Sequence, residues 1–294
     1  MDSMPPPQSQ RVIQVVRHES ALGSWIMILS DPAPQLRSSI VRYCDYTEHT
    51  PGPLRRRELP SPQITLIIDL GPTVRILNSS GDAVIALHHG GFVAGLDNTW
   101  TLTESLGHMR CIQVDFTLTG AQRILHESMT SIAGCTVSLD DYFGSAAQLL
   151  RDQLLESRRA ESRFQLLDEF FTARLTRPGA QSDWVESAWD RIQTSGGRLS
   201  IRALAEGSGF SARHLESCFK NRFGMTPKQL ARLVRFNSVL ADLRSGRFAD
   251  WTSIAVNHGY FDQAHFIRDF KQYSGGTPTE FWKRQLPDRG GVRG

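Results

Sequence analysis

"GYFDQAHFIRDFKQYSGGTP", residues 259–278, repeats a pattern that occurs about fifty residues earlier in the chain. The offset between the two copies is 50 residues up to Gly259 and 51 residues from Phe266 onward, so one residue is inserted between these two positions. The matching residues are Leu204-Ala205 with Ile254-Ala255, Gly209 with Gly259, Phe219-Lys220 with Phe270-Lys271, and 224–227 with 275–278 (Gly-x-Thr-Pro). Such self-similarity indicates two copies of one supersecondary unit.

The residues of each copy predict two helices joined by a tight turn. In the second copy, Ala255 is small enough for a close helix crossing, and Gly259 suits a turn that needs positive φ. Phe266 and Phe270 lie four residues apart and form the inward face of the following helix. In the first copy the same positions are Ala205, Gly209, Leu215 and Phe219. The sequence therefore predicts a helix-turn-helix, twice.

Both copies end in a helix stop followed by a helix start. Gly224 and Gly275 suit the position after a helix end, and Thr226 and Thr277 each predict the cap of a helix whose first residue is proline. The stretch between the copies, 226–246, predicts a helix of about 18 residues, roughly 27 Å long. Its apolar stripe consists of Leu230, Leu233, Val234, Leu240 and Leu243. We expect this helix to hold the two units at a fixed separation.

The first half of the chain has strand patterns. Short β-branched or alternating runs occur at 63–71, 73–77, 83–89 and 109–116, separated by turn residues, which is typical of a sandwich or barrel. From Thr119 onward, apolar spacings of three and four residues predict helices. Strands followed by helices favour an α+β domain.

The segment TRPGAQSD, 176–183, predicts a linker. We therefore expect a β-rich domain with C-terminal helices at 11–177, a linker at 178–183 and an all-α domain at 184–286. The helices expected in the all-α domain are 184–195, 200–207, 211–223, 227–245, 250–257, 262–274 and 278–285.

Charge is distributed unevenly over the 294 residues. Residues 183–294 hold 17 Lys and Arg against 11 Asp and Glu, whereas the remainder holds 16 against 19. All four lysines lie in the C-terminal part. This asymmetry favours a polyanionic partner for that part.

Composition argues against a membrane protein and a metal protein. No apolar run approaches the roughly 18 residues that span a bilayer, and the acidic, proline-rich N-terminus differs from a signal peptide, so we expect a cytoplasmic protein. The four cysteines, at 44, 111, 135 and 218, form no CxxC pair. We expect reduced thiols, no bound metal and no cofactor.

The stretch SIRALAEGSGFSARHLESCFKNRFGMTPKQLARLVR (200–235), together with 259–278, resembles the DNA-binding domain of AraC/XylS-family transcriptional regulators, over about Trp184 to Arg284. The resemblance implies seven helices, two helix-turn-helix units and binding to double-stranded DNA. It further implies transcriptional regulation with RNA polymerase as a partner, for which we expect an activator with repression left open, and it allows a homodimer and a small-molecule effector.

The second unit departs from the family pattern at its turn. Where the family usually has Gly-Phe-Ser, this chain has Gly259-Tyr260-Phe261, so the capping serine is missing. We expect Asp262 to supply the cap one residue later. Ala264 replaces a frequent serine, which changes one backbone or phosphate contact.

The N-terminal part more loosely resembles the β-rich sensor domains that precede such units, through ITLIIDLG and IQVDF. The resemblance implies a barrel-like fold and effector binding, and no ligand-binding residue is named. We interpret Arg55-Arg56-Arg57 as a solvated loop, with an anion site as the alternative. The aromatic residues Phe92, Trp100 and Phe116 are interpreted as core, with a pocket as the alternative.

The inward faces of the second helices leave specific side chains for DNA. By position, the family's base-reading residues fall on Gln263, Ala264, Ile267 and Arg268; glutamine suits adenine, arginine suits guanine, and isoleucine suits a thymine methyl. Lys271 lies on a flanking face. On the first unit the corresponding residues are Arg213, Glu216 and Ser217, and the expected phosphate contacts are Lys220, Arg222 and Lys228.

Two other function classes stay open from the sequence. The DNA-binding part can be fused to a catalytic N-terminal domain, but a DNA alkylation-repair enzyme needs a zinc-held cysteine cluster and a cupin-type enzyme needs a histidine-rich site. Neither pattern is present, so we expect no enzyme. The other alternative is an N-terminal domain that only mediates protein interactions.

Overall fold

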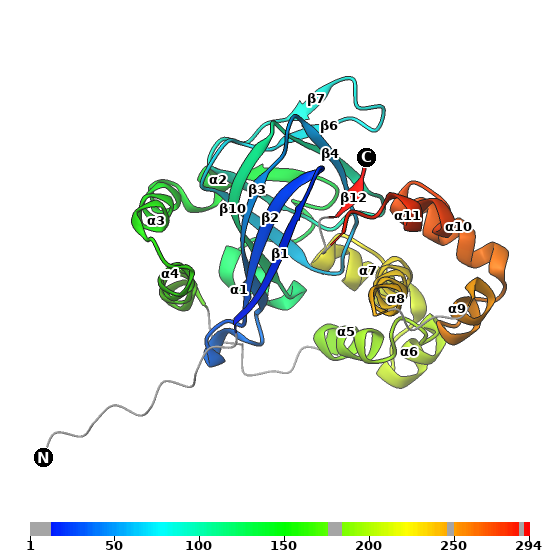
Figure 1. Cartoon of the computed structure of the whole chain (residues 1–294). Coiled ribbons are helices and arrows are strands. Elements are labelled where there is room, and N and C mark those ends of the chain that lie inside the picture. The colour runs from blue at the N-terminus through cyan, green and yellow to red at the C-terminus, as the bar shows by residue number, and fades with distance from the viewer. Residues whose placement is uncertain (1–12, 176–183, 246–249, 288–290) are drawn as a thin grey trace, which may run out of the picture.

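The computed structural model describes residues 13–175, 184–245, 250–287 and 291–294. It has a β-rich part and a helical part that lie against each other (Figure 1). This is the α+β two-domain arrangement that we expected. The linker expected at 178–183 lies outside the described residues, and the domain boundaries stay a prediction.

The β-rich part consists of two antiparallel sheets. In the described chain, one sheet has seven strands in the order β1-β2-β3-β10-β5-β8-β11, and the other has five in the order β12-β4-β9-β6-β7. The strands are β1 (Ile13–Ser20), β2 (Gly23–Ser30), β3 (Ile40–His49), β4 (Leu54–Glu58), β5 (Ile64–Asp69), β6 (Arg75–Leu77), β7 (Val84–Ala86), β8 (Gly91–Ala94), β9 (Thr101–Ser105), β10 (His108–Phe116), β11 (Thr136–Ser138) and β12 (Val292–Arg293). The strands expected at 63–71, 73–77, 83–89 and 109–116 are confirmed as β5, β6, β7 and β10.

Strand β5, in the seven-stranded sheet, has apolar residues on both of its faces. Leu66 and Ile68 belong to the main core, whereas the intervening Ile67 packs into a second cluster with Phe92 and Cys111. Successive side chains of a strand point to opposite faces, so both faces of β5 are covered. Phe92 and Phe116 are buried core residues, as interpreted from the sequence.

Helices cover one flank of the larger sheet (Figure 1). They are η1 (Pro34–Leu36), α1 (Leu118–Leu125), α2 (Leu139–Phe143), α3 (Ser145–Glu156) and α4 (Ala160–Arg174). Helix α4 packs Phe171 edge-on against Phe116 of β10, with ring centroids 5.3 Å apart. The hydroxyl of Tyr43 donates to Oδ1 of Asp168 at 2.9 Å, which fixes α4 on β3.

The helical part follows the expected pattern closely. Within described residues 184–287 it has seven helices: α5 (Trp184–Thr194), α6 (Ile201–Ser208), α7 (Ala212–Phe223), α8 (Pro227–Arg244), α9 (Trp251–Asn257), α10 (Gln263–Ser274) and α11 (Pro278–Arg284). Each boundary lies within one residue of the expected span because caps and turn glycines are local signals.

The last residues return to the β-rich part. Strand β12 pairs antiparallel with β4, with Val292 opposite Arg57 and Arg293 opposite Arg56. The chain end therefore adds a strand to the smaller sheet, beside β4 in Figure 1. The two parts are linked through this sheet as well as through packing.

The interpretation of Arg55-Arg56-Arg57 as a solvated loop is wrong. These residues lie in β4, where Arg56 points to one face and Arg55 and Arg57 to the other. Each of the three has its own partner. Arg55 Nε donates to Glu104, its cross-strand neighbour, at 2.9 Å. Arg56 is buried and ion-pairs with buried Glu48. Arg57 reaches the helical part, as described below.

Candidate nucleic-acid interface

The second helix-turn-helix is α9–α10. Gly259 forms the turn with φ 69°, and the Asp262 carboxylate accepts a hydrogen bond from the backbone N–H of His265 at 2.6 Å. The expected replacement cap is thus confirmed. Phe266 and Phe270 are fully buried, which fixes the inward face of α10.

The first helix-turn-helix is α6–α7, and it has the same plan. Gly209 has φ 73°, and the Ser211 hydroxyl accepts from the backbone N–H of His214 at 3.2 Å. Leu215 and Phe219 are fully buried, as predicted.

Helix α8 joins the two units and has 18 residues. Thr226 begins it with a capping box to Gln229, and all five residues of the predicted stripe are buried. Phe236 of α8 packs edge-on against Phe270, with centroids 5.3 Å apart. Apolar packing along one rigid helix therefore supports the fixed separation of the units.

A partly buried ion pair also fastens α10 to α8. Arg232 donates from Nε to Oδ2 of Asp269 at 3.1 Å and from Nη2 to Oδ1 at 2.8 Å. Asp269 is buried, and its hydrogen bonds raise the pKa of Arg232. Such bidentate geometry fixes both position and orientation.

Most of the residues proposed to contact DNA lie on the surface. Ile267 is half-buried and packs on the core, so only part of its side chain faces outward. The exposed residues are Arg213, Glu216, Ser217 and Lys220 on α7, Lys228 on α8, and Gln263, Ala264, Arg268 and Lys271 on α10. Across the described chain, no hydrogen bond or ion pair occupies the side chains of Arg213, Gln263 or Arg268. These three donors are therefore available to a ligand.

Arg222 has a different role from the expected phosphate contact. Its Nε donates to Oε1 of Gln122 in α1 at 3.0 Å, and it is half-buried. Burial and the neighbouring Arg123 lower its pKa. Arg222 therefore faces the β-rich part.

The C-terminal end of α7 is held by the β-rich part. The Thr130 hydroxyl lies 3.1 Å from the carbonyl oxygen of Lys220 and 2.9 Å from that of Asn221. The Gln122 side-chain amide donates to the carbonyl of Arg222 at 3.0 Å. The carbonyls of Asn221 and Arg222 are among those that a helix leaves without internal partners, whereas that of Lys220 also accepts from the backbone N–H of Gly224.

The C-terminal end of α10 is held in the same way by other residues. Arg57 Nη1 donates to the carbonyls of Ser274 at 3.3 Å and Gly275 at 2.9 Å, and its guanidinium lies 4.6 Å from the Trp100 ring centroid. Burial, followed by the charge of Arg284, lowers the pKa of Arg57. Trp100 is half-buried at this contact rather than in the β core.

The glycines that end α7 and α10 lie close to side chains of the β-rich part. Gly224 and Gly275 have φ 76° and 72°. A Cβ on Gly224 would lie 2.6 Å from Cβ of Ala133, and one on Gly275 would lie 2.4 Å from Nε1 of Trp100. Sequence reasoning missed the residues on the β-rich side because nothing local in their sequence indicates a partner 90 or 100 residues away.

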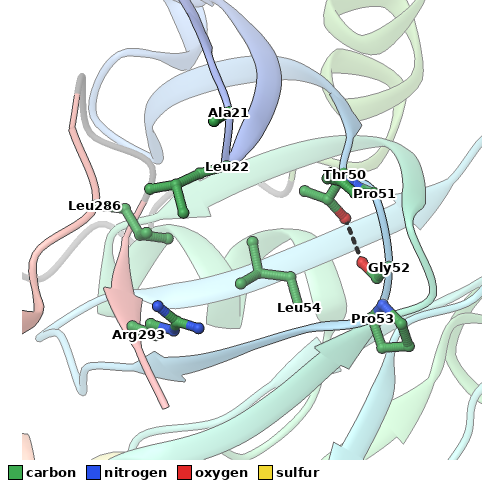
Figure 2. A pocket seen from close by; sticks show the side chains of 9 residues that line it. All are labelled: Ala21, Leu22, Thr50, Pro51, Gly52, Pro53, Leu54, Leu286 and Arg293. Atoms are coloured by element: carbon green, nitrogen blue, oxygen red, sulfur yellow. Dashed lines mark hydrogen bonds between the residues drawn. The ribbon is translucent and has the colours of Figure 1, made fainter.

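A cavity of about 200 Å³ lies where the chain end meets the β-rich part. Figure 2 shows Leu22 and Leu54 of the β-rich part together with Leu286 and Arg293 of the C-terminal segment. A second cavity, of about 510 Å³, is lined by β-rich residues that include Arg75, His89 and Leu87. The first cavity is lined from both parts of the molecule.

Similar proteins identify the helical part. A family model described as a helix-turn-helix domain matches residues 204–284. The probable transcription factor PqrA from Proteus vulgaris is 33% identical over 108 residues, which are 36% of this chain and 83% of that protein. This chain belongs to the AraC/XylS family of transcriptional regulators.

Solved structures with low identity are also similar. ToxT from Vibrio cholerae is 11% identical with a TM-score of 0.48, over 81% of this chain and 96% of that one. The C-terminal domain of AraT, a response regulator from Geobacillus stearothermophilus, is 24% identical with a TM-score of 0.34, over 37% and 90%.

The AraC/XylS chain is therefore a DNA-binding transcription regulator. Members of this family are regulators and not enzymes, which favours this function over the repair and cupin alternatives. Among the described helices, none combines the length and apolarity that crossing a bilayer requires.

Proposed function

We propose that this regulator reads a specific DNA site with α7 and α10 and that its N-terminal domain, 11–177, adjusts this reading in response to a small molecule. The observation that carries the proposal is the double attachment of the β-rich part. It contacts the same end of both second helices, at Gly224 and Gly275, and leaves their outer faces exposed.

For α10, we propose that Arg268 donates to a guanine and Gln263 to an adenine, with Ala264 and the exposed part of Ile267 facing thymine methyls. For α7, Arg213, Glu216 and Ser217 take the base-facing positions. Lys220, Lys228 and Lys271 contact phosphates, which position the protein without reading sequence.

The test compares Arg268→Ala with Lys228→Ala on sites selected from random DNA. Arg268→Ala is expected to weaken binding to the selected site by about 1 to 3 kcal/mol and to relax the preference at one base pair. Lys228→Ala is expected to weaken binding to all sequences alike and to reduce the salt slope by about one. An unchanged base preference in Arg268→Ala would contradict the assignment of that residue.

Small-molecule sensing has a separate test. The cavity lined by Leu54 and Leu286 joins the two parts, so a molecule bound there contacts both. A ligand that binds only the folded chain raises its melting temperature by mass action. Screening a broad metabolite set for this shift is expected to find an effector that also changes DNA affinity. No shift throughout the set would favour a purely protein-interaction domain.

We also propose RNA polymerase and a second copy of the chain as partners, and activation as the outcome. Sedimentation with and without the selected DNA measures the oligomeric state. Transcription from a template that carries the selected site, with purified polymerase, measures activation. A monomer that binds its site and leaves transcription unchanged would contradict both.

A further inference from the structure

Phe261 is the residue that the second unit has and the first unit lacks. In the first unit Phe210 is followed directly by the cap Ser211, whereas in the second Tyr260 is followed by Phe261 and then by the cap Asp262. The inserted residue is therefore an aromatic one, placed immediately before the recognition helix α10.

The packing position at this turn is already filled by Tyr260. Its ring centroid lies 5.2 Å from that of Phe266 and 5.4 Å from that of His265, and Tyr260 is buried. In the first unit Phe210 packs at 4.4 Å from Trp184. Because Tyr260 takes the inner place, Phe261 points away from the protein and is 92% exposed.

An exposed phenylalanine here does not contribute to the core. Burying such a side chain is favourable relative to leaving it in water. Phe261 is the most exposed of the large apolar side chains in the described chain. That free energy is available to a binding partner.

The position of Phe261 selects DNA as this partner. Residues at the N-terminal end of a recognition helix contact base edges in the major groove. Phe261 lies two residues before Gln263 and next to the cap of α10. The apolar group that the major groove presents is the C5-methyl of thymine, which phenylalanine can contact.

We infer that Phe261 is a further specificity-determining residue, which packs against a thymine methyl at the edge of the segment read by α10. This inference rests on the proposed reading of DNA by α10. It adds an apolar contact that the first unit cannot make, because no residue stands between Phe210 and the cap Ser211.

The experiment removes the ring and the methyl separately. Each thymine of the selected site is replaced by deoxyuridine, which lacks the C5-methyl, and fluorescence anisotropy measures binding by the wild-type chain, Phe261→Ser and Phe261→Leu. At one thymine the wild-type chain is expected to lose about three- to tenfold in affinity. Phe261→Ser is expected to lose about as much on unmodified DNA and nothing further at that thymine, and Phe261→Leu to keep part of the preference.

Two controls make the result specific. Thermal unfolding of Phe261→Ser is expected to match the wild-type chain, because the side chain is almost fully exposed. Leu149→Ala removes another exposed apolar side chain, on α3 of the β-rich part, and is expected to leave DNA affinity unchanged.

The outcomes separate the inference from the proposed function. If Arg268→Ala relaxes the base preference while Phe261→Ser leaves both affinity and deoxyuridine sensitivity unchanged, the inference is overturned and the reading by α10 stands. Unchanged DNA binding with a loss of transcription in Phe261→Ser would assign the ring to polymerase and would also overturn it. If Arg268→Ala has no effect either, the proposed function fails.

Discussion

The two helix-turn-helix units share their turns and caps but differ in how the recognition helix is fastened. Helix α10 has Asp269 paired with Arg232 of α8, within the DNA-binding part. The equivalent position in α7 is Cys218, which packs against the core without a charge. The two units therefore share the glycines and caps that form the tight turn. The contact that holds each recognition helix in place, at Asp269 or Cys218, differs between the units.

The largest difference in stability is expected between variants that remove Asp269 and Cys218, the residues that hold α10 and α7 in place. Asp269→Ala leaves Arg232 without its carboxylate and is expected to lower the free energy of unfolding by about 2 to 4 kcal/mol, less than for a fully buried pair because Arg232 keeps some contact with water. The matched Cys218→Ala is expected to cost about 1 kcal/mol or less. Denaturant unfolding of both variants measures the difference, and equal losses would contradict the distinction between the units.

The next comparison concerns the glycines that follow the helices. Gly209→Ala tests positive φ alone, since a Cβ there would lie in open space, and is expected to cost about 1 kcal/mol. Gly275→Ala adds a clash with the Trp100 ring, so a loss of about 2 to 3 kcal/mol is expected. Gly224→Ala meets Ala133 and is expected to resemble Gly275→Ala.

The Gly275→Ala and Gly224→Ala variants are expected to lose more free energy of unfolding than Gly209→Ala. This additional loss measures how much the contact with the N-terminal domain contributes to the stability of the whole chain. Three equal losses in chemical unfolding would show that the two parts separate freely in solution. That result would contradict the proposal that the β-rich part acts on DNA reading through its contacts with the ends of α7 and α10.

The smallest effects are expected from single hydrogen bonds across the contact. Thr130→Val removes the one hydroxyl hydrogen that faces the carbonyls of Lys220 and Asn221, and Thr99→Val removes a hydrogen bond to the carbonyl of Gln272. Because these groups are exposed to water, each variant is expected to lose about 1 kcal/mol or less, with the larger loss for Thr130→Val. Amide hydrogen exchange is expected to rise at the end of α7 in the first variant and at the end of α10 in the second. Faster exchange at both ends in either variant would contradict independent attachment.

The helical part was predictable because its signals are local. Gly259, Asp262 and Thr277 each act on residues within one turn of themselves, so spacing alone places the helix ends. The β-rich part was only partly predictable. The runs at β5 and β10 are strongly apolar, whereas β1 and β4 carry charged residues. Strand β4 also pairs with β9 and β12, which lie far from it in the sequence.

The contact between the two parts could not be predicted either, because it also joins residues that are far apart in the sequence. Three consecutive arginines give no sign that Arg56 will be buried with Glu48 while Arg57 reaches α10. Phe261 was visible in the sequence only as an irregularity of the repeat. Its exposure follows from Tyr260 taking the inner position, which requires the packed structure.

The central claim is that α7 and α10 each read one segment of the same face of DNA. Missing-contact footprinting on the selected site tests it, with the wild-type chain, Arg213→Ala and Arg268→Ala. We predict two major-groove segments centred about 10 to 10.5 base pairs apart, with Arg213→Ala losing contacts in one and Arg268→Ala in the other. A single protected segment, or the loss of the same base pairs in both variants, would contradict it.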